Sequence, residues 1–498
     1  MNLSSIIKRS ATYFPEKKAL VFENAFFTYE ELNACVNRIA SFLREKGIKK
    51  GDRVGVYAEN RPEWIMAYFG IIRLGAAVVP ISAAYKGSEV EHMIKDAEAR
   101  LVVTTEALAG SMPAREALPH LKEVLVIEKD GVLSSLRAEK GAGAEPIDIV
   151  ECDPDDMCVV LYTGGTTGTP KGAMMTHRNL LYASQNVCYH ERLVPDDVGL
   201  CFMPLNHVFA SIHIMISTLY AGATLVLHKG FDMDEIISSI GVNKVTRLYA
   251  VPTVYIRFLN NPDCHEHLRT VRYSFSAATS MPSEVVRQWK DTFGLNIHEA
   301  YGMTETASLV TFNHIYRHKI GSVGTPAGLV EVRLVDPDGK DVAAGADGEI
   351  VIRAPNVMKG YLNRPDETAQ AIVDGWLHSG DVGRFDEEGY LFIVDRLKDM
   401  IITGGLNVFP AEVEEIIYTH EAVEECSVVG LPDKEYGEAV TAFVQLKKGH
   451  NPTDTEIIRF CKGKTASYKA PKRVVFVEDF PRTHQGKILK RELKKYRG

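Results

Sequence analysis

The stretch Tyr162-Thr163-Gly164-Gly165-Thr166-Thr167-Gly168-Thr169-Pro170-Lys171-Gly172 combines four glycines, four threonines and one lysine in eleven residues. Glycine lets backbone N–H groups approach an anion closely, and successive N–H groups form a concave nest for phosphate oxygens. Hydroxyls and a lysine ammonium add donors and positive charge. The apolar run Cys158–Leu161 directly before it is typical of a buried strand. The stretch therefore predicts a phosphate-binding loop at the end of a strand, in preference to a flexible surface turn.

This loop differs from the common P-loop, which needs a glycine, four residues and then Gly-Lys-Ser/Thr. Here Pro170 precedes Lys171, and Gly172 follows it. No dinucleotide-binding fingerprint follows a predicted strand elsewhere in the sequence. The pattern argues against kinase-like or GTPase-like chemistry on a P-loop scaffold.

Length and composition describe an ordinary globular protein of several domains. The chain has 498 residues, 45% hydrophobic and 24% charged, with a net charge of −8 that argues against a nucleic-acid partner. The N-terminus lacks the apolar core of a signal peptide, and no apolar run is long enough for a membrane helix. The eight cysteines are scattered without a C-x-x-C pair, which predicts free thiols and a cytoplasmic location.

Strand-like runs alternate with amphipathic segments through most of the chain. Arg53–Tyr57 and Ala77–Pro80 are typical of buried strands, and Pro62–Leu74 of a helix with proline in its first turn. After residue 345 the pattern changes to shorter strands and turns. The charged run Asp395–Asp399 then precedes about a hundred residues with an α/β pattern, which is enough for a small domain. The fold class is therefore α/β, with buried sheets flanked by helices.

Three further polar segments could serve a nucleotide. In Glu299–Glu305, Tyr301 could stack on a base, and Glu305 could hold Mg²⁺ together with phosphate oxygens. Asp381 follows a tight turn and could accept both hydroxyls of a ribose, while Arg396 could reach a ribose or a phosphate. Taken alone, Glu299–Glu305 is more commonly an ordinary polar loop. His207 lies in an apolar setting where a structural core histidine is the commoner case.

Taken together, these residues resemble the adenylate-forming enzymes, a family that includes acyl- and aryl-CoA synthetases, firefly luciferase and peptide-synthetase adenylation domains. The resemblance covers essentially the whole chain, and six motifs occur in the family's order: Tyr162–Gly172, Pro204–His207, Tyr301–Glu305, Ser379–Asp381, Asp395–Asp399 and Pro481–Lys487. It implies a large N-terminal domain of several subdomains (1–396), a hinge (397–399) and a small mobile α+β C-terminal domain (400–498).

The resemblance also implies roles for individual residues. It implies two half-reactions, in which a carboxylate attacks the α-phosphorus of ATP and coenzyme A then attacks the acyl-adenylate. Mg²⁺ is the implied cofactor, with Glu305 as its ligand. The implied catalytic residues are Lys487, His207, Thr166 and the hinge residue Lys398. Those implied for coenzyme A are Gly404, Gly405 and Asn407. Those implied for ATP are Thr163, Gly164, Gly165, Thr166, Thr167, Gly168, Lys171, Ala278, Thr279, Glu299, Ala300, Tyr301, Thr304, Asp381, Ile393, Arg396 and Lys487.

The leading hypothesis is an acyl-CoA synthetase for a fatty or aromatic monocarboxylic acid, with ATP, the acid and coenzyme A as small-molecule partners. A homodimer is compatible with the sequence. An alternative is a stand-alone adenylation enzyme that loads a carrier protein. Family members that activate amino acids place an aspartate near the Pro204–Phe209 region, and no acidic residue occurs between Phe202 and Tyr220. A third hypothesis is a nucleotide-binding protein without catalysis, against which the presence of Glu305, Asp381 and Lys487 argues.

Overall fold

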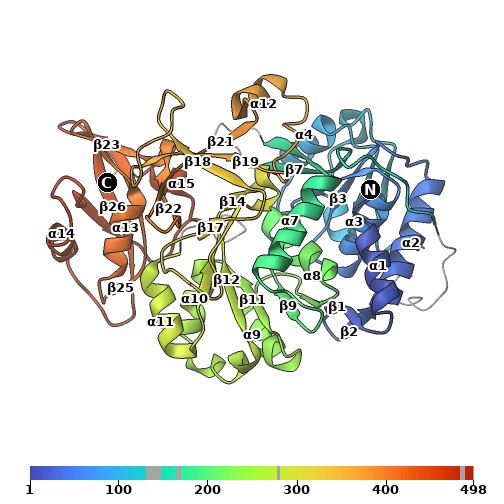
Figure 1. The fold of residues 1–498 in the computed structure, drawn as a ribbon, viewed down its shortest axis with the longest axis horizontal. Coiled ribbons are helices and arrows are strands. Elements are labelled where there is room, and N and C mark those ends of the chain that lie inside the picture. Colours follow the sequence, from blue (N-terminus) through green and yellow to red (C-terminus); the bar gives the residue numbers. More distant parts are fainter. Residues whose placement is uncertain (130–146, 164–169, 278–280, 483–487, 497–498) are drawn as a thin grey trace.

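The structure is a computed structural model, and it describes residues 1–129, 147–163, 170–277, 281–482 and 488–496. Its elements form a large domain and a small C-terminal domain, so the predicted α/β class with two unequal domains is confirmed. Figure 1 shows the small domain, orange to red, at one end of the molecule and the N-terminal helices α1 (Ser5–Tyr13) and α2 (Tyr29–Glu45), in blue, at the other.

The first sheet of the large domain carries the glycine-rich stretch. Six of the described strands form it, in the order β6-β5-β3-β4-β7-β8. All neighbours are parallel except the last pair, in which β7 and β8 form an antiparallel hairpin. Residues 53–57 are a strand as predicted. The strands are β3 (Arg53–Tyr57), β4 (Ala77–Ile81), β5 (Leu101–Thr104), β6 (Glu123–Val126), β7 (Met157–Thr163) and β8 (Lys171–Thr176).

A second sheet in the large domain has seven described strands, in the order β13-β12-β11-β9-β10-β1-β2. It is parallel apart from the β1–β2 hairpin. Strands β10, β11, β12 and β13 are buried along their whole length, as parallel strands covered on both faces require. The strands are β1 (Lys18–Phe22), β2 (Ala25–Thr28), β9 (Val198–Cys201), β10 (Thr224–Leu227), β11 (Arg247–Ala250), β12 (Tyr273–Ser276) and β13 (Ile297–Glu299).

One continuous core joins the two sheets of the large domain. Helix α3 (Pro62–Arg73) is buried along its whole length, which explains why its sequence is apolar on every face. Gly70 lets α2 approach α3, because a Cβ at this position would lie 2.7 Å from Ile39 Cγ2. The remaining described helices of these layers are α4 (Ser88–Asp96), α5 (Glu106–Ala109), α7 (His177–His190), the π-helix η2 (Phe209–Ile216), α8 (Ser217–Tyr220), α9 (Met233–Val242), α10 (Pro252–Leu259) and α11 (Ser283–Phe293).

An antiparallel sheet completes the large domain and leads to the small one. Its strands are β18 (Glu331–Val335), β19 (Gly348–Arg353), β20 (Ile372–Val373), β21 (Trp376–Phe385) and β22 (Leu391–Arg396), and α12 (Pro365–Ala371) precedes β20. Two short hairpins, β14 (Gly302–Met303) with β15 (Ser308–Leu309) and β16 (Thr311–Phe312) with β17 (Thr325–Pro326), connect this sheet to β13. No helix in the described ranges combines the length and the apolar character that crossing a bilayer requires.

The small domain has a sheet and apolar clusters of its own. The described strands are β23 (Ile401–Thr403), β24 (Leu406–Val408), β25 (Val423–Asp433), β26 (Gly437–Leu446) and β27 (Arg473–Phe476), and the helices are α13 (Pro410–Tyr418), α14 (Asp454–Lys462) and α15 (Lys490–Leu493). Both clusters draw their buried side chains from residues 401–493 alone. The small domain therefore has a core of its own.

Candidate active site

The glycine-rich stretch begins in β7 and ends in β8. Thr163 ends β7 and Lys171 begins β8, and the two residues face each other in the ladder. Gly172 is required by packing, because a Cβ there would lie 2.7 Å from Val160 Cγ1. The predicted ATP ligands Gly164, Gly165, Thr166, Thr167 and Gly168 lie outside the described residues. The described ends of the hairpin thus place Lys171 at the edge of the first sheet.

Lys171 and Glu305 meet on either side of one tyrosine, Tyr361. The ammonium of Lys171 lies 5.3 Å from the centre of the Tyr361 ring, and the Tyr361 hydroxyl donates a 2.8 Å hydrogen bond to Glu305 Oε1. The Met358 N–H donates to the Glu305 carbonyl at 2.8 Å, which fixes the backbone as well. Burial raises the pKa of Tyr361, and the Glu305 charge adds to that effect. The hydroxyl therefore stays protonated and orients the Glu305 carboxylate.

Tyr361 is a site residue that the sequence analysis missed. It belongs to none of the polar motifs, and its bridge to Ala173 of β8 joins segments almost 190 residues apart in the chain. A single sequence gives no signal for a contact of that range, because local periodicity reports only a residue's own element.

The Glu305 carboxylate fits Mg²⁺ held together with a nucleotide. Within the described part of the chain, no three His, Cys, Asp or Glu side chains gather into a cluster that could hold a metal. Mg²⁺ usually takes one or two carboxylates plus substrate phosphate oxygens and water, so a single carboxylate beside a phosphate loop matches its chemistry. Bound there, the ion would offset negative charge on the phosphates.

A second polar group joins the motifs around Asp381, Tyr301 and Arg396. Asp381 and Arg396 are ladder partners on β21 and β22, and Arg396 Nε lies 3.1 Å from Asp381 Oδ1. The hydroxyl of Tyr301 donates a 2.7 Å hydrogen bond to Asp381 Oδ2. The structure therefore brings three predicted nucleotide residues into contact. It also gives the Tyr301 hydroxyl a partner, so the tyrosine ring is the part left for stacking.

Glu299 is a buried carboxyl at the end of β13, next to Ser276 of β12 in the sheet. Burial raises the pKa of Glu299 to about 8, and the nearby carboxylate of Glu415 from the small domain adds to the rise. Backbone N–H groups of Met281 and Gly321 partly offset it. At neutral pH the carboxyl is thus largely protonated, and a protonated carboxyl can donate a hydrogen bond as well as accept one.

Replacing Glu299 with glutamine is expected to flatten the pH dependence of thermal stability. The folded state keeps a proton up to about pH 8, while the unfolded state releases it near the ordinary value of 4.5. Wild-type stability should therefore fall as pH rises between these values, and Glu299→Gln should remove this contribution. Unfolding temperatures at about pH 5 and pH 8 measure the effect. The exposed Glu387→Gln is the control, and an identical fall in Glu299→Gln and wild type would contradict the assignment.

His207 precedes the π-helix η2 and has its ring oriented by the backbone. Its Nδ1 accepts a 3.3 Å hydrogen bond from the Phe209 N–H, and its carbonyl accepts from the Ser211 hydroxyl at 3.0 Å. Because Nδ1 accepts, the proton of the neutral ring lies on Nε2. The histidine is therefore fixed between the end of β9 and the start of η2.

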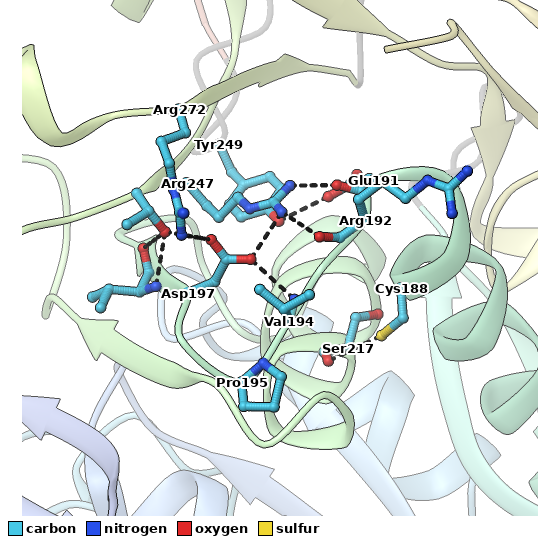
Figure 2. A network of polar contacts seen from close by, with 12 residues as sticks. Cys188, Glu191, Arg192, Val194, Pro195, Asp197, Ser217, Arg247, Tyr249 and Arg272 are labelled. Atoms are coloured by element: carbon cyan, nitrogen blue, oxygen red, sulfur yellow. Dashed lines mark hydrogen bonds and ion pairs between the residues drawn. The ribbon is translucent and has the colours of Figure 1, made fainter. Parts of the chain in front are cut away.

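A buried ionic network joins Glu191 and Asp197 to Arg247 (Figure 2). Arg247 of β11 lies between the carbonyl of Glu191, at 2.6 Å, and the carboxylate of Asp197, at 2.8 Å. The Tyr249 hydroxyl donates to Glu191 Oε2 at 2.8 Å, and His213 of η2 lies 2.9 Å from Glu191 Oε1. Removing one partner of such a buried pair leaves an uncompensated charge. The network therefore fixes η2 against β11, and its role is structural.

A cavity of about 350 Å³ lies beside Pro204 and Asn206, directly before His207. It is open at the ends of β3, β4, β9, β10 and β11, and Phe202, Phe231 and Val254 make it largely apolar. Its described lining also includes three cationic side chains, those of Lys229, Arg257 and Arg482. Arg482 belongs to the small domain and donates a 3.1 Å hydrogen bond to Glu425. The cavity is therefore closed partly by the small domain in this orientation.

The two domains also meet away from the cavity. Glu415 of α13 accepts a 3.3 Å hydrogen bond from the first N–H of α11, at Ser283. Lys398 lies in the turn Leu397–Asp399 between the domains, where burial lowers its pKa and the charge of Arg396 lowers it further. The residues predicted for coenzyme A do not line the cavity: Gly404 and Gly405 lie in the turn between β23 and β24, and Asn407 lies in β24.

Three more residues predicted to bind ATP lie in the described part of the chain. Ala300 follows β13, Thr304 begins the turn that carries Glu305, and Ile393 lies on β22 beside Gly383. Outside the described residues lie Ala278, Thr279 and Lys487, as well as the five hairpin residues named above.

Comparison with known proteins agrees with this geometry. The family model of the AMP-binding enzyme matches residues 7–362, and that of the AMP-binding enzyme C-terminal domain matches residues 412–487. The chain therefore belongs to the AMP-binding enzyme family, in its acyl-CoA synthetase branch. It is 37% identical over 490 residues to a feruloyl-CoA synthase of Amycolatopsis sp, covering 98% of this chain and 97% of that protein.

Two further relatives extend the comparison. The chain is 34% identical over 529 residues to a long-chain-fatty-acid–CoA ligase of Bacillus subtilis (strain 168), covering 99% of this chain and 94% of that protein. The crystal structure of ATP-bound MatB from Rhodopseudomonas palustris superposes with a TM-score of 0.92 at 32% identity, covering 99% of each chain. Similarity thus extends over both domains, and the protein is an AMP-forming acid–thiol ligase.

Proposed function

We propose that this protein converts a fatty or aromatic monocarboxylic acid, ATP and coenzyme A into acyl-CoA, AMP and pyrophosphate. The observation that carries the proposal is the presence of two polar groups that the short segment Tyr301–Glu305 joins. Lys171 and Glu305 meet at Tyr361 beside the glycine-rich hairpin, and Asp381 is held by Tyr301 and Arg396. The first group has the charges for a triphosphate, and the second has the carboxylate for a ribose.

In the first half-reaction the acid's carboxylate attacks the α-phosphorus of ATP, and pyrophosphate leaves. Negative charge shifts onto the leaving phosphates, so fixed positive groups there lower the barrier. We assign Lys171 and the hairpin to the β- and γ-phosphates, and Lys487 to the acid and the α-phosphate. Glu305 would hold Mg²⁺, which supplies further charge compensation when bound. His207 would lie beside the acid's carboxylate.

In the second half-reaction the thiol of coenzyme A attacks the acyl carbon, and AMP leaves. We infer that the small domain, residues 400–498, rotates about a hinge at 397–399 between the two steps. This rotation would remove Arg482 from the cavity and bring Gly404, Gly405 and Asn407 towards it. Such a movement lets one site perform two reactions in turn. The eight free thiols suit a cytoplasmic location.

A panel of substrates tests which carboxylic acid the enzyme activates. No acidic residue occurs between Phe202 and Tyr220, so the region around His207 offers no counter-charge for a substrate amine. The two curated relatives above bear the names of a feruloyl and a long-chain fatty-acid enzyme. Acids from acetate to palmitate, benzoates and hydroxycinnamates should be compared by AMP formation with coenzyme A. The proposal expects activity with one of these monocarboxylates, and dependence on an amino acid instead would contradict it.

Arg257 is expected to serve coenzyme A rather than the acid. Its guanidinium lies 5.3 Å from the ring centre of Phe231 and lines the apolar cavity. An apolar passage with cationic side chains suits the pantetheine arm and phosphates of coenzyme A. A hydrogen bond to a charged group contributes about 1.5–3 kcal/mol, or about 10-fold or more. Arg257→Gln should therefore raise the KM for coenzyme A about 10-fold, while acid-dependent ATP–pyrophosphate exchange stays unchanged.

Arg287→Gln, on the exposed face of α11, is the matched control for this substitution. A rise in the KM for the acid, with the KM for coenzyme A unchanged, would contradict the assignment and place the acyl group in the cavity.

A further inference from the structure

Asp395 forms a buried contact across the hinge. It lies on β22 of the large domain, three residues before Lys398, and its strand pairs with β21. Its Oδ1 accepts a 2.7 Å hydrogen bond from the Arg396 N–H, and its Oδ2 accepts a 2.9 Å hydrogen bond from the Ala411 N–H. Ala411 is the second residue of α13, in the small domain. One carboxylate of the large domain therefore caps the first turn of a small-domain helix.

This contact is chemically favourable as long as the domains keep this orientation. The first N–H groups of a helix have no partner within the helix, and its N-terminus favours negative charge. Phe409 occupies the N-cap position of α13, and its side chain makes no capping hydrogen bond. The Asp395 carboxylate from the other domain takes that place.

Lys490 of α15 supports the contact with an opposite charge. Its ammonium lies 2.8 Å from Glu414 Oε1, which also accepts a 2.7 Å hydrogen bond from the Val428 N–H. Burial raises the pKa of Asp395, and Lys490 offsets part of that rise. Burial alone would lower the pKa of Lys490, but Glu414 and Asp395 together raise it. The two groups are therefore close enough to stabilise each other's charged form.

Lys490 is also close in the chain to the segment with the predicted catalytic lysine. Arg482 and Ile488 form an antiparallel bridge, and the Leu489 N–H donates to the Pro481 carbonyl at 2.7 Å. The segments on either side of residues 483–487 are thus hydrogen-bonded to each other, and Lys490 lies directly after the second of them. A group that fixes Lys490 therefore also fixes the position of these two paired segments relative to the large domain.

We propose that Asp395 is a positioning residue that, through the α13 N-terminus and Lys490, holds the small domain in the orientation for acyl-adenylate formation. The inference rests on the proposed two-step function. A rotation about Lys398 moves Ala411 and Lys490, while Asp395 stays in its strand, so the contact exists in one orientation and breaks in the other. Asp399 and Glu414 are the other carboxylates facing Lys490. Glu414 belongs to the small domain, and Asp399 lies in the hinge.

Other described contacts between the domains are weaker. The Ser283–Glu415 hydrogen bond is 3.3 Å long and the Asn260–Glu424 hydrogen bond is 3.4 Å long, and both are exposed. Exposed contacts of this kind are screened by water and salt. The buried Asp395 contact therefore has the larger influence on which orientation is populated.

The test compares both half-reactions in substituted proteins. Asp395→Ala and Lys490→Met should each lower acid-dependent ATP–pyrophosphate exchange about 10-fold, the range of a lost charged hydrogen bond. Both should convert supplied acyl-adenylate to acyl-CoA at the wild-type rate or faster. Lys490→Arg should retain exchange because it keeps the charge. The double variant should lose little more than either single one, since both act through one contact. Asp341→Asn, a surface partner of Arg333, is the matched control.

A distance measurement separates positioning from a general structural defect. Nitroxide labels on cysteines introduced at the exposed Val242 and Lys434 report the separation of the two domains. With ATP bound, wild type should show one main distance, and Asp395→Ala should shift population to a second one. An unchanged distribution, or equal loss in both half-reactions, would overturn the proposal. If wild type itself forms no acyl-adenylate, the proposed function fails, while the distance distributions still decide whether Asp395 sets the orientation.

Discussion

Glu305→Gln is expected to lower acid-dependent ATP–pyrophosphate exchange by about 10²-fold, in line with the loss of one charge-stabilising group in a preorganised site. The Glu305 carboxylate accepts a hydrogen bond from Tyr361, whose ring lies beside the Lys171 ammonium. Glutamine keeps the shape and the hydrogen-bond acceptor but removes the charge that would hold Mg²⁺. The exchange rate of Glu305→Gln should therefore respond to higher Mg²⁺ concentrations than that of wild type.

Tyr361→Phe is the matched control for this prediction. It removes the hydroxyl that orients Glu305 and leaves the carboxylate in place, so a smaller loss of about 10-fold or less is expected. If Glu305→Gln and wild type show the same rate and the same Mg²⁺ dependence, Glu305 does not serve the metal. A larger loss in Tyr361→Phe than in Glu305→Gln would assign the main role to the tyrosine.

Lys487→Ala is expected to suppress ATP–pyrophosphate exchange by about 10²–10³-fold and to spare the conversion of supplied acyl-adenylate to acyl-CoA. A contact with charge that develops in the transition state typically contributes that much to the rate. The motif Pro481–Lys487 motivates the assignment. The residues on either side of 483–487, Arg482 and Ile488, form an antiparallel bridge. If the small domain rotates between the steps, the lysine is near the reacting atoms in the first step alone.

The two half-reactions are measured separately, by exchange of labelled pyrophosphate into ATP and by acyl-CoA formation from synthetic acyl-adenylate. Lys495→Ala removes a nearby surface lysine that pairs with Glu492 and should leave both rates unchanged. Equal losses in the two half-reactions of Lys487→Ala would show that the lysine does not distinguish the steps.

Local patterns in the sequence predicted individual elements well. Residues 53–57 are a strand with the predicted bounds, and the strand predicted at 77–80 extends one residue further, to Ile81. The predicted helix at Pro62 ends one residue earlier, at Arg73. These elements are specified by short-range periodicity and by a proline at a helix start. The glycine-rich stretch was also placed correctly at the end of a strand, because the apolar run before it is local information.

The contacts that assemble the site were not predictable from these patterns. The order of strands in the two large sheets, the bond between Tyr301 and Asp381 and the role of Tyr361 all join residues far apart in the chain. Such contacts depend on how buried faces pack together, which periodicity within one element does not encode. The same reason applies to Asp395, which the sequence shows only as the first charge of the run Asp395–Asp399 and which is buried against α13 in the structure.

Transfer of oxygen from the acid to AMP tests the central claim most directly. In an acyl-adenylate mechanism a carboxylate oxygen attacks the α-phosphorus, and this oxygen leaves with AMP when the thiol attacks the acyl carbon. With an acid labelled with ¹⁸O in its carboxylate, plus ATP and coenzyme A, mass spectrometry should find one ¹⁸O atom in each AMP formed. AMP without label, or label in inorganic phosphate with ADP as the product, would contradict the account.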